Sequence, residues 1–420
     1  MSYFVLADCN TFYVSCERLF NPKIRTTPVI VLSNNDGCVV ALSGEAKAIG
    51  IKMGQPYFQI QEACIRHKVA VYSSNYRLYG DLSQRVMNVL GESYAEIEVY
   101  SIDEAFLKYP DSLSSELVVA DCIELRKKVK KWVGIPMSLG VAPTKVLAKI
   151  ATDIAKRQKV EVFDITSKDV QTQILKDYPI ERIWGIGENL TRRLRSMQIY
   201  TAADLMEKDP YIIRQKLGVR GERILLELQG VSCLDLEDPS DKKSICSSRS
   251  FGKPLTDQSQ IAEALSAFAS VACVKLRAQN SCANAIYVSL QSVIDPQTGK
   301  RRRYGLVKKL SSPTNDTSEI LTMAKKALKV LFREEEHYNK CGIVLLDLIA
   351  EHNVVPDFFI KNDLPQRKKL MSTIDTLNHR FGKDKLFFGA VGTDPQWRMR
   401  CNKRSPYTTT DWKGLPIVKA

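Results

Sequence analysis

Hydrophobic and polar positions predict two strands that each end in acidic residues. Tyr3–Ala7 is a continuous apolar run that stops at Asp8, and such a run is typical of a strand buried on both faces. A second strand-like run, 97–102, leads into Asp103 and Glu104. Each acidic phrase is therefore expected where a buried strand meets water.

This arrangement could bring three carboxylates together, and such a cluster is stable only when cations neutralise it. Hard oxygen ligands favour Mg²⁺. A solvated hairpin tip is the alternative interpretation of Asp103-Glu104. The aromatic pair Phe12-Tyr13, which follows Asp8, could wall a small-molecule pocket beside the metals or simply pack in the core.

A helix is expected to start near Thr144. Its core-facing residues would be Val146, Leu147, Ile150 and Ile154. On the opposite face Lys145, Lys149, Thr152 and Lys156 recur at helical spacing. This basic stripe fits a solvated surface and a triphosphate site equally well.

The segment 165–236 is predicted to be helical, with a helix-hairpin-helix signature at its centre. Gly185 and Gly187 open a helix there, and free backbone N–H groups at a helix N-terminus favour phosphate. A tight helix-helix turn is the alternative, but Arg192-Arg193 and the echo at 218–221 favour binding to the DNA backbone. The stretch 236–241 is predicted to be an exposed linker.

Between 242 and 350 the periodicity switches regularly between strand and helix. Strand-like runs occur at 244–251, 285–293, 304–310 and 342–349, and the helical stripes are Ile261, Leu265, Phe268, Ala272 and Leu321, Ala324, Leu328, Leu331. Two β-α-β halves of this kind predict a four-stranded sheet backed by two helices. The other face of the sheet would be free for nucleic acid.

The charge balance supports a polyanionic partner. The 420-residue chain carries 61 Lys and Arg against 47 Asp and Glu, a net charge of +14. Residues 242–309 hold twelve basic against three acidic residues, so more than half of the net charge lies there. The alternative is a basic domain that is merely soluble.

Other site classes find little support. The eleven cysteines are an odd number without a Cys-x-x-Cys pair, and the four histidines are scattered, so neither disulfides nor zinc is expected. The sequence has no run of eighteen apolar residues and no basic leader. We therefore expect no membrane contact and a cytoplasmic location, associated with the nucleoid when engaged on DNA.

Six motifs resemble those of the Y-family translesion DNA polymerases. They are Asp-x-Asn-x-Phe-Tyr at 8–13, Ser-Asn-Asn-Asp-Gly-Cys-Val at 33–39, Glu-Ala-Lys-Ala-Ile-Gly at 45–50, Ser-Ser-Asn-Tyr at 73–76, Tyr-Ser-Ile-Asp-Glu-Ala-Phe at 100–106 and Trp-Gly-Ile-Gly at 184–187. Phrases at 247–252 and 370–378 favour the UmuC branch, the catalytic subunit of bacterial DNA polymerase V and its plasmid-borne relatives. The resemblance covers essentially the whole chain.

The resemblance implies an α+β multidomain fold, a right-hand polymerase with a C-terminal interaction tail. The implied domains are a palm at 1–12 and 79–165, fingers at 13–78, a helix-hairpin-helix thumb at 166–235, a linker at 236–241, a βαββαβ little finger at 242–350 and a partner-binding region at 351–420.

The resemblance also implies roles for individual residues. Asp8, Asp103 and Glu104 would coordinate two Mg²⁺ ions, helped by the main-chain carbonyl of Cys9, one ion activating the primer 3′-hydroxyl and the other neutralising the triphosphate. Tyr13 would be the steric gate that excludes a ribose 2′-hydroxyl. The implied nucleotide-binding residues are Phe12, Lys47 and Lys156, and the implied DNA-binding residues are Gly185, Gly187, Arg192, Arg249, Arg301, Arg302 and Arg303.

Two segments depart from the family pattern. Gly44 and Lys47 stand where many members carry a Tyr and an Arg that grip the phosphates, so we expect a weaker grip or one supplied by the helix lysines. The stretch 355–359 lacks the Gln of a sliding-clamp motif, which puts clamp binding in doubt. Aromatic residues of the tail resemble the region that holds a processed UmuD-like dimer, or pack in a core: Phe387, Phe388, Trp397, Tyr407 and Trp412.

The sequence thus predicts an error-prone, template-directed DNA polymerase of the SOS response that copies past damaged bases. Its partners would be primer-template DNA, dNTPs, a UmuD-like processed dimer and a RecA filament. Two alternatives remain, a Y-family polymerase that works alone and a non-catalytic DNA-binding scaffold.

Overall fold

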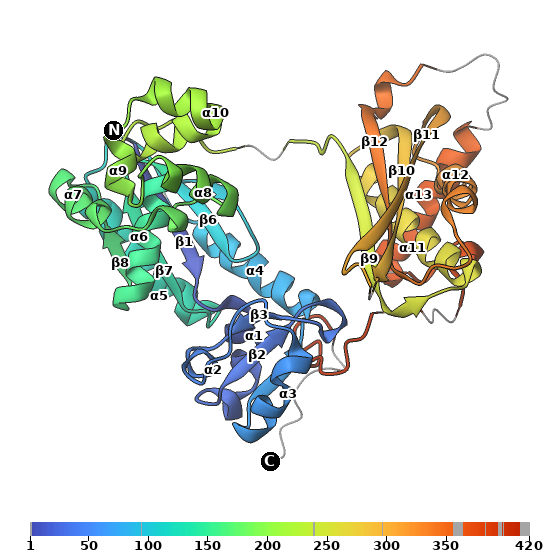
Figure 1. Ribbon diagram of the computed structural model, residues 1–420, viewed down its shortest axis with the longest axis horizontal. Helices are drawn as coiled ribbons and strands as arrows, with labels where there is room; N and C mark the ends of the chain where they lie inside the picture. The colour runs from blue at the N-terminus through green and yellow to red at the C-terminus, as the bar shows by residue number, and fades with distance from the viewer. Residues whose placement is uncertain are drawn as a thin grey trace. The chain divides into compact units, whose positions relative to one another are not determined.

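The computed structural model describes residues 2–93, 95–237, 240–295, 297–355, 364–382, 384–393, 397 and 399–411. These residues divide into two units (Figure 1). The first unit contains the chain up to 237 except 34–36, together with 402–411, and the second contains 34–36 and 240–401. The segment after 364 thus contributes to both units.

A five-stranded sheet forms the centre of the first unit. Its strands, in spatial order, are β5 (Glu96–Val99), β6 (Glu104–Tyr109), β1 (Tyr3–Cys9), β7 (Met137–Ala142) and β8 (Val162–Asp164). All neighbours are antiparallel except β7 and β8. The strand predicted at 97–102 is shorter than expected, because the chain turns after Val99 and re-enters the sheet at Glu104.

Both faces of β1 are buried, as its continuous apolar run predicts. Val5 and Ala7 join a core with α1 (Phe12–Phe20), α4 (Tyr76–Leu90) and α5 (Ser115–Trp132). Phe4 and Leu6 face the opposite way, toward α6 (Lys145–Gln158). Because side chains alternate along a strand, Asp8 lies on the α6 side of the sheet.

Helix α6 begins where the sequence predicts, with Thr144 as its N-cap. The prediction that Lys145 and Thr152 face away from the core is wrong, since they are only 3% and 2% exposed. The reason is that this stripe of α6 packs against the sheet, where Lys145 binds Glu98 and lies over the Phe106 ring. The Thr152 hydroxyl donates to the Leu6 carbonyl at 3.1 Å.

A smaller three-stranded sheet follows α1 in sequence. Its strands are β3 (Val39–Leu42), β2 (Val29–Leu32) and β4 (Ala70–Ser73) in spatial order, with helices α2 (Gly44–Ala48) and α3 (Tyr57–Arg66). Buried residues of these elements form their own core. The short 3-10 helices of the chain are η1 (Pro22–Ile24), η2 (Asn34–Asp36), η3 (Ile180–Arg182), η4 (Glu351–Asn353) and η5 (Gly389–Val391).

The predicted helical segment consists of four helices. They are α7 (Lys168–Lys176), α8 (Glu188–Ser196), α9 (Ala202–Met206) and α10 (Pro210–Leu228). Gly185 has φ +90° and Gly218 has φ +75°, a conformation that glycine adopts at little cost. Gly187 caps α8, and Gly218 interrupts α10, so both predicted glycine turns are present.

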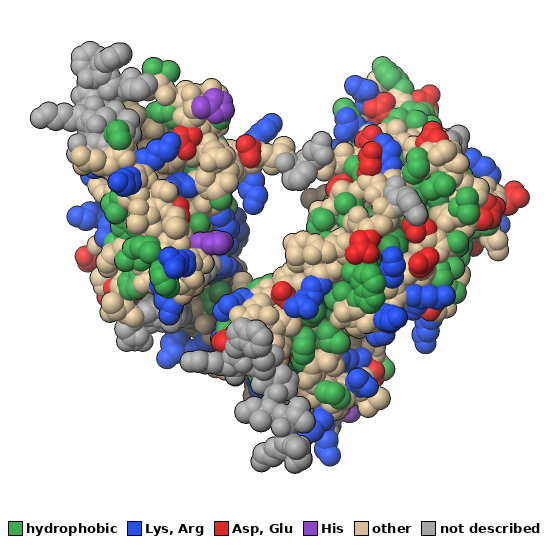
Figure 2. Space-filling model, turned by 180° about the vertical axis from the view of Figure 1, so that it is seen from behind, with side chains coloured by type: hydrophobic (Ala, Val, Ile, Leu, Met, Phe, Trp, Pro, Cys, Tyr) green, Lys and Arg blue, Asp and Glu red, His purple; other side chains and the backbone are tan. Residues whose placement is uncertain are grey.

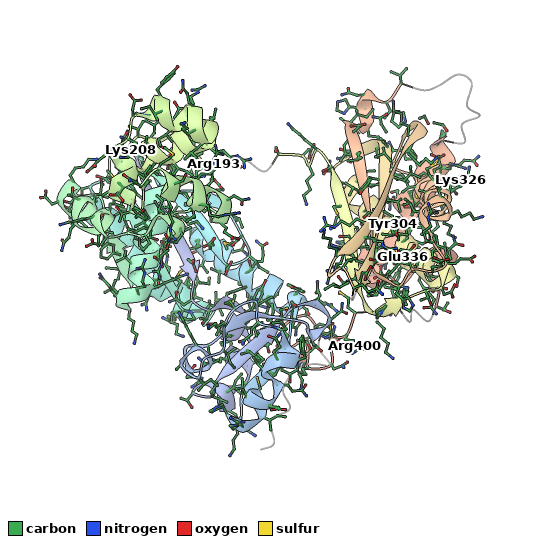
Figure 3. The ribbon with its side chains drawn as sticks, in the orientation of Figure 1. Arg193, Lys208, Tyr304, Lys326, Glu336 and Arg400 are labelled. Carbon is green, nitrogen blue, oxygen red and sulfur yellow. The ribbon has the colours of Figure 1, made fainter. Side chains whose placement is uncertain are left out.

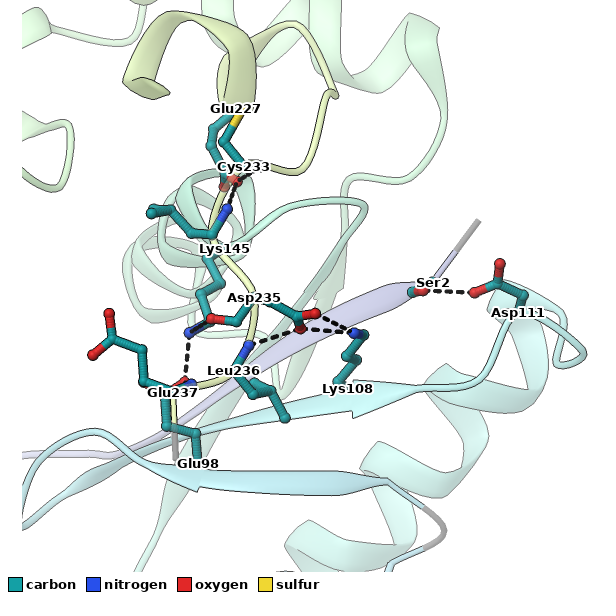
Figure 4. A network of polar contacts seen from close by, with 11 residues as sticks. Ser2, Glu98, Lys108, Asp111, Lys145, Glu227, Cys233, Asp235, Leu236 and Glu237 are labelled. Atoms are coloured by element: carbon teal, nitrogen blue, oxygen red, sulfur yellow. Dashed lines mark hydrogen bonds and ion pairs between the residues drawn. The ribbon is translucent and has the colours of Figure 1, made fainter. Parts of the chain in front are cut away.

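A polar network ties the end of this helical segment to the sheet (Figure 4). Glu227 accepts the backbone N–H groups of Cys233 and Leu234 at 2.6 and 2.9 Å. Asp235 accepts from Lys108 at 2.6 Å through its side chain and from Lys145 at 2.8 Å through its carbonyl. The chain is therefore anchored up to this point before it enters the stretch predicted to be a linker.

The second unit contains the predicted sheet with two helices on one face. The strand order is β11 (Arg301–Thr314), β10 (Ser281–Ile294), β12 (Tyr338–Ala350) and β9 (Ile245–Leu255), and the helices are α11 (Gln258–Ala278) and α12 (Thr317–Leu331). Both predicted helical stripes are buried against the sheet. The βαββαβ prediction is confirmed, with strands that extend beyond the predicted bounds.

The C-terminal segment adds helix α13 (Leu364–Phe381) to this unit. Arg277 on α11 binds Asp375 with two hydrogen bonds of 2.6 and 2.8 Å. Phe388 and Trp397 pack against the core of the unit, so core packing accounts for these two aromatic residues. Residues 356–359 of the clamp-like stretch and Trp412 lie outside the described residues.

Basic side chains are spread over the visible face of both units, among acidic and apolar ones (Figure 2). Among the described helices, none combines the length and the apolar character that crossing a membrane requires.

Candidate active site

Asp8 and Glu104 are direct neighbours in the five-stranded sheet. They are paired in the antiparallel register of β1 and β6, and both lie on the α6 side. Asp8 is 7% exposed. This register brings the two acids together at the ends of their strands, as the sequence predicts.

Asp103 is held beside them by the turn that precedes β6. Its backbone carbonyl accepts the Cys9 N–H at 2.8 Å, and its carboxylate accepts the Ser101 hydroxyl at 2.7 Å. The last residue of β1 and the first turn residue before β6 are thus fastened together. All three acids therefore lie at the same end of the neighbouring strands β1 and β6.

Two lysines of α6 neutralise the acids. Lys149 binds Glu104 at 2.7 Å, and Lys156 forms an ion pair with Asp8. The two lysines are about two helical turns apart and therefore share one helix face. The contact of both lysines with the acids favours the site interpretation of the basic stripe over the solvated one.

Burial raises the pKa of Asp8 to about 7, although Lys156 acts in the opposite direction. Burial also acts to raise the pKa of Glu104, but the hydrogen bonds from Lys149 and Asp8 outweigh it and lower that pKa. Asp8 and Glu104 therefore titrate as an interacting pair, in which burial disfavours the charged form of Asp8 and the Lys149 bond favours that of Glu104.

The acids and lysines open into a cleft of about 420 Å³. It is lined by Leu6, Asp8, Glu104, Lys149, Thr152, Asp153, Lys156, Tyr178, Arg182 and Trp184. The last three come from the helical segment that follows β8. The indole of Trp184 donates to the Tyr100 hydroxyl at 3.1 Å, which joins the glycine-turn motif to the acidic turn.

The aromatic pair after Asp8 divides between core and site. Phe12 is buried in the core, whereas Tyr13 is half-buried and stacks on Tyr79 with ring centroids 4.4 Å apart. The edge of Tyr76 meets the same ring at 6.2 Å. Burial, with Tyr76 and Asp103 nearby, raises the pKa of Tyr13 to about 12, so its hydroxyl stays protonated next to the acidic edge.

Lys47 is exposed in the last turn of α2. The neighbouring Glu45 binds Arg18 at 2.8 Å. The lysines that contact the acids come from α6. This is the arrangement needed for the second of the two expectations stated for Gly44 and Lys47, a phosphate grip supplied by the helix lysines.

Comparison with known proteins agrees with this geometry. Residues 7–153 match the impB/mucB/samB family and residues 242–357 match its C-terminal domain. "Protein ImpB" of Salmonella typhimurium is 39% identical over 99% of both chains, and "Protein UmuC" of Salmonella typhimurium (strain LT2) is 38% identical over 99% of this chain and all of its own. The chain belongs to the impB/mucB/samB family.

Two further comparisons concern more distant proteins. A "DNA polymerase IV" of Oceanobacillus iheyensis is 27% identical over 90% of this chain and 89% of its own. The structure of the "Y-family DNA polymerase chimera Dbh-Dpo4(243-245)-Dbh" matches 83% of this chain and 99% of its own at 23% identity, with a TM-score of 0.69. Residues 368–418 match a domain of unknown function, DUF4113.

The fold of this impB/mucB/samB family member is therefore that of a Y-family polymerase. The resemblance predicts that the five-stranded sheet is the palm, that the three-stranded sheet belongs to the fingers, that the four helices are the thumb and that the second unit holds the little finger, and these names are used below in that sense. The resemblance stated from the motifs is confirmed for family and fold.

The predicted DNA-binding arginines of the little finger do not share one environment. Arg249, Arg301 and Arg303 are exposed on β9 and β11. Arg302 is 63% exposed as well, but it binds Glu336 at 2.7 Å. The Tyr304 hydroxyl donates to the same carboxylate, and Figure 3 labels Tyr304 and Glu336. In the thumb, Arg192 is exposed beside the Gly185–Gly187 turn.

Sequence reasoning missed several residues of the cleft. Asp153 accepts the Tyr178 hydroxyl at 2.9 Å, and Arg182 and Trp184 complete the wall. Trp184 was noted only as part of a glycine-turn motif. No periodicity links it to Tyr100, because the two residues meet through the packing of thumb on palm.

Proposed function

We propose that this chain is an error-prone, template-directed DNA polymerase that performs translesion synthesis by two-metal-ion nucleotidyl transfer. The observation that carries the proposal is that Asp8, Glu104 and Asp103 lie together at the end of two neighbouring strands, next to Tyr13. The chain also belongs to a family whose more distant relatives include DNA polymerases. Asp8, Asp103 and Glu104 are the proposed catalytic residues.

The donor set fits magnesium. Three carboxylates and the Cys9 carbonyl supply hard oxygen ligands. Burial raises the pKa of Asp8, and a bound cation would favour its charged form. Within the described residues, no three His, Cys, Asp or Glu side chains are gathered tightly enough to enclose an ion. Lys149 and Lys156 pair with two of the three acids.

Two Mg²⁺ ions, when bound, would activate the primer 3′-hydroxyl and stabilise the charge that develops on the phosphates. Asp8 and Glu104 would hold these ions as carboxylates. Lys149 and Lys156 line the same cleft, and their ammonium groups would bind oxygens of the triphosphate in place of the family grip at Gly44 and Lys47.

Tyr13 is proposed as the steric gate. Its ring is fixed by Tyr79 and Tyr76, so it cannot move aside without breaking two aromatic contacts. A rigid ring discriminates against a ribose 2′-hydroxyl by clash. Phe12, which the resemblance assigns to the nucleotide site, is buried next to the Tyr13 ring and would support that ring.

DNA contacts are proposed for the thumb and the little finger. Gly185, Gly187 and Arg192 would hold backbone phosphates at the N-terminus of α8, and Arg301 and Arg303 would hold them on the exposed sheet face. Arg249 is exposed too, but it shares the helix-facing side of β9 with Ile245 and Phe251, so it would reach phosphates from the border of the sheet. The domain bounds implied by the resemblance are proposed as they stand. A processed UmuD-like dimer and a RecA filament are the proposed protein partners within the SOS response, in the cytoplasm.

Primer extension tests the proposal. Purified protein with Mg²⁺, dNTPs and a primed template should extend the primer, also past a damaged template base. The Glu104→Gln variant keeps the shape of the side chain and should bind DNA without extending it. Reactions with and without a UmuD-like dimer separate a partner-dependent enzyme from one that works alone, and no extension in either reaction would favour the scaffold.

A further inference from the structure

The end of the domain of unknown function lies against the fingers. Residues 403–408, which we call the strap, belong to the first unit and run beside the end of β4 and the start of α4 (the red trace near α4 in Figure 1). No sequence motif predicted this contact. Every interaction described below is made within the first unit.

Backbone hydrogen bonds fix the register of the strap. The Ser73 N–H donates to the Lys403 carbonyl at 3.1 Å, and the Lys403 N–H donates to the Ser73 hydroxyl at 2.9 Å. Ser73 and Arg404 form a parallel bridge. The strap therefore docks in one alignment, which determines the side chains that meet the fingers.

The fully buried side-chain amide of Asn75 binds the strap. The Nδ2 of Asn75, which has no exposed surface, donates to the Ser405 carbonyl at 3.1 Å, the Ser405 hydroxyl at 2.9 Å and the Pro406 carbonyl at 3.2 Å. The Oδ1 of the same side chain caps α4 by accepting the Leu78 N–H at 3.4 Å. A buried amide requires such partners, so the start of α4 and the strap depend on one another.

A buried carboxylate extends this contact to the proposed gate. Glu17 is 2% exposed, and its Oε1 accepts the Ser405 hydroxyl at 3.1 Å and the Tyr79 hydroxyl at 2.6 Å. The Tyr79 ring is the one on which Tyr13 stacks, at 4.4 Å and 15°. Ser405, Glu17, Tyr79 and Tyr13 thus form an unbroken series of contacts.

A pair of arginines holds the far end of the strap. The guanidinium groups of Arg77 and Arg404 lie 4.5 and 4.6 Å from the centre of the Tyr407 ring. Such cation–π contacts are favourable. Together with the buried bonds of Ser405, they indicate a fixed docking rather than a loose end of chain.

We infer that the strap is a positioning element for sugar selection, in which Ser405 acts through Glu17 and Tyr79 on the ring of Tyr13. The inference rests on the proposed function, because it gives Tyr13 the role of gate. Without Ser405 the buried Glu17 has one donor fewer, and the Tyr79 hydroxyl alone must satisfy it. The Tyr79 ring then tilts toward Glu17 and no longer fixes the ring stacked upon it.

The test measures kcat and KM for single insertions of a dNTP and of the matching rNTP. Ser405→Ala should reduce discrimination against the rNTP by roughly threefold to tenfold, the range that corresponds to the net contribution of one ordinary hydrogen bond. The gain should appear in kcat/KM for the rNTP, with kcat for the dNTP near that of the parent. Ser405→Thr keeps the hydroxyl and should behave as the parent.

Thr410→Ala is the matched control, because the Thr410 side chain is exposed and only its backbone N–H contacts the strap, at Tyr407. Its discrimination should equal that of the parent. Equal losses for both sugars in Ser405→Ala would mean a general loss of stability and would overturn the inference. Unchanged discrimination would overturn it as well.

A second variant keeps the inference testable if Ser405→Ala folds poorly. Tyr79→Phe keeps the stacked ring and removes the hydroxyl that binds Glu17, so it should relax discrimination to a similar extent. The two changes together should be non-additive, because they break one series of contacts. The proposed series of contacts is contradicted if the two changes reduce sugar discrimination additively. It is also contradicted if Tyr79→Phe discriminates against the rNTP as well as the parent does.

The outcomes separate this inference from the proposed function. If the parent inserts no dNTP, the proposed function fails and the inference with it. If the parent is active but Tyr13→Ala remains strict, the gate lies elsewhere and both the gate and the strap assignment fail. If Tyr13→Ala admits ribose and the Ser405 and Tyr79 variants do not, only the strap inference is lost.

Discussion

Replacing Arg277 by Ala should undock α13 from the little finger. The Arg277 side chain is 12% exposed, and its partner Asp375 is 28% exposed. Besides its two bonds to Asp375, the guanidinium donates to the Asn315 carbonyl and the Thr317 hydroxyl, both at 2.9 Å. Removing it leaves a partly buried carboxylate and a carbonyl without this donor.

The loss should amount to about 2–4 kcal/mol, because hydrogen bonds to charged groups contribute about 1.5–3 kcal/mol and an uncompensated acid adds to the loss. Alanine is at least as good a helix former as arginine, so the change does not weaken α11 itself. The melting temperature of the second unit should fall by on the order of 10 °C. Calorimetry of the full chain would measure it.

Arg367→Ala, on α13 itself, is the matched control. Arg367 is 46% exposed and pairs with Glu319 and, at 3.8 Å, with Asp316, and an ion pair of such an exposed side chain contributes about 0–1 kcal/mol. Its melting temperature should stay close to that of the parent. If Arg277→Ala melts like Arg367→Ala, α13 is not docked in solution, and the segment is a separate module available to a partner.

Three further predictions concern the site and the DNA. Asp103→Asn removes one charge that would hold the metals, so insertion rates should fall by orders of magnitude while DNA binding survives; near-parental extension would exclude this role. Tyr13→Ala should admit rNTPs, as gel analysis of single insertions would reveal, and a strict variant would return the residue to core packing. Arg301→Ala with Arg303→Ala should reduce the slope of log affinity against log salt by about 2, whereas Arg302→Ala alone should change it little; equal effects of all three would contradict the pairing of Arg302 with Glu336.

The fold could be predicted wherever one element supplies its own pattern. The apolar run of β1 and the stripes of α11 and α12 were placed correctly because burial repeats along a single strand or helix. The bounds were less certain, as the early end of β5 at Val99 shows. A polar turn such as 100–103 has no periodicity, so its length depends on the partner strand.

The candidate site was predictable only in part. The acids follow from strand ends, but the pairing of Lys149 with Glu104 and of Lys156 with Asp8 depends on the packing of α6 over β1 and β6. The sequence predicted two faces for α6, one apolar and one basic. It could not show that the polar stripe itself packs against the sheet, where Thr152 binds the Leu6 carbonyl and Lys145 binds Glu98.

The C-terminal segment shows the limit of sequence reasoning most clearly. Asn75 and Ser405 are 330 residues apart, and neither lies in a pattern that a polar buried contact would produce. Removal of 351–420 should do more than abolish partner binding, because it takes Met371 and Trp397 from the core of the second unit and Ser405 from Glu17. A buried amide and a buried carboxylate would then lack partners in the fingers, which is costly. The tail therefore stabilises the polymerase that carries it, and a UmuD-like dimer would have to bind a surface that this packing leaves exposed.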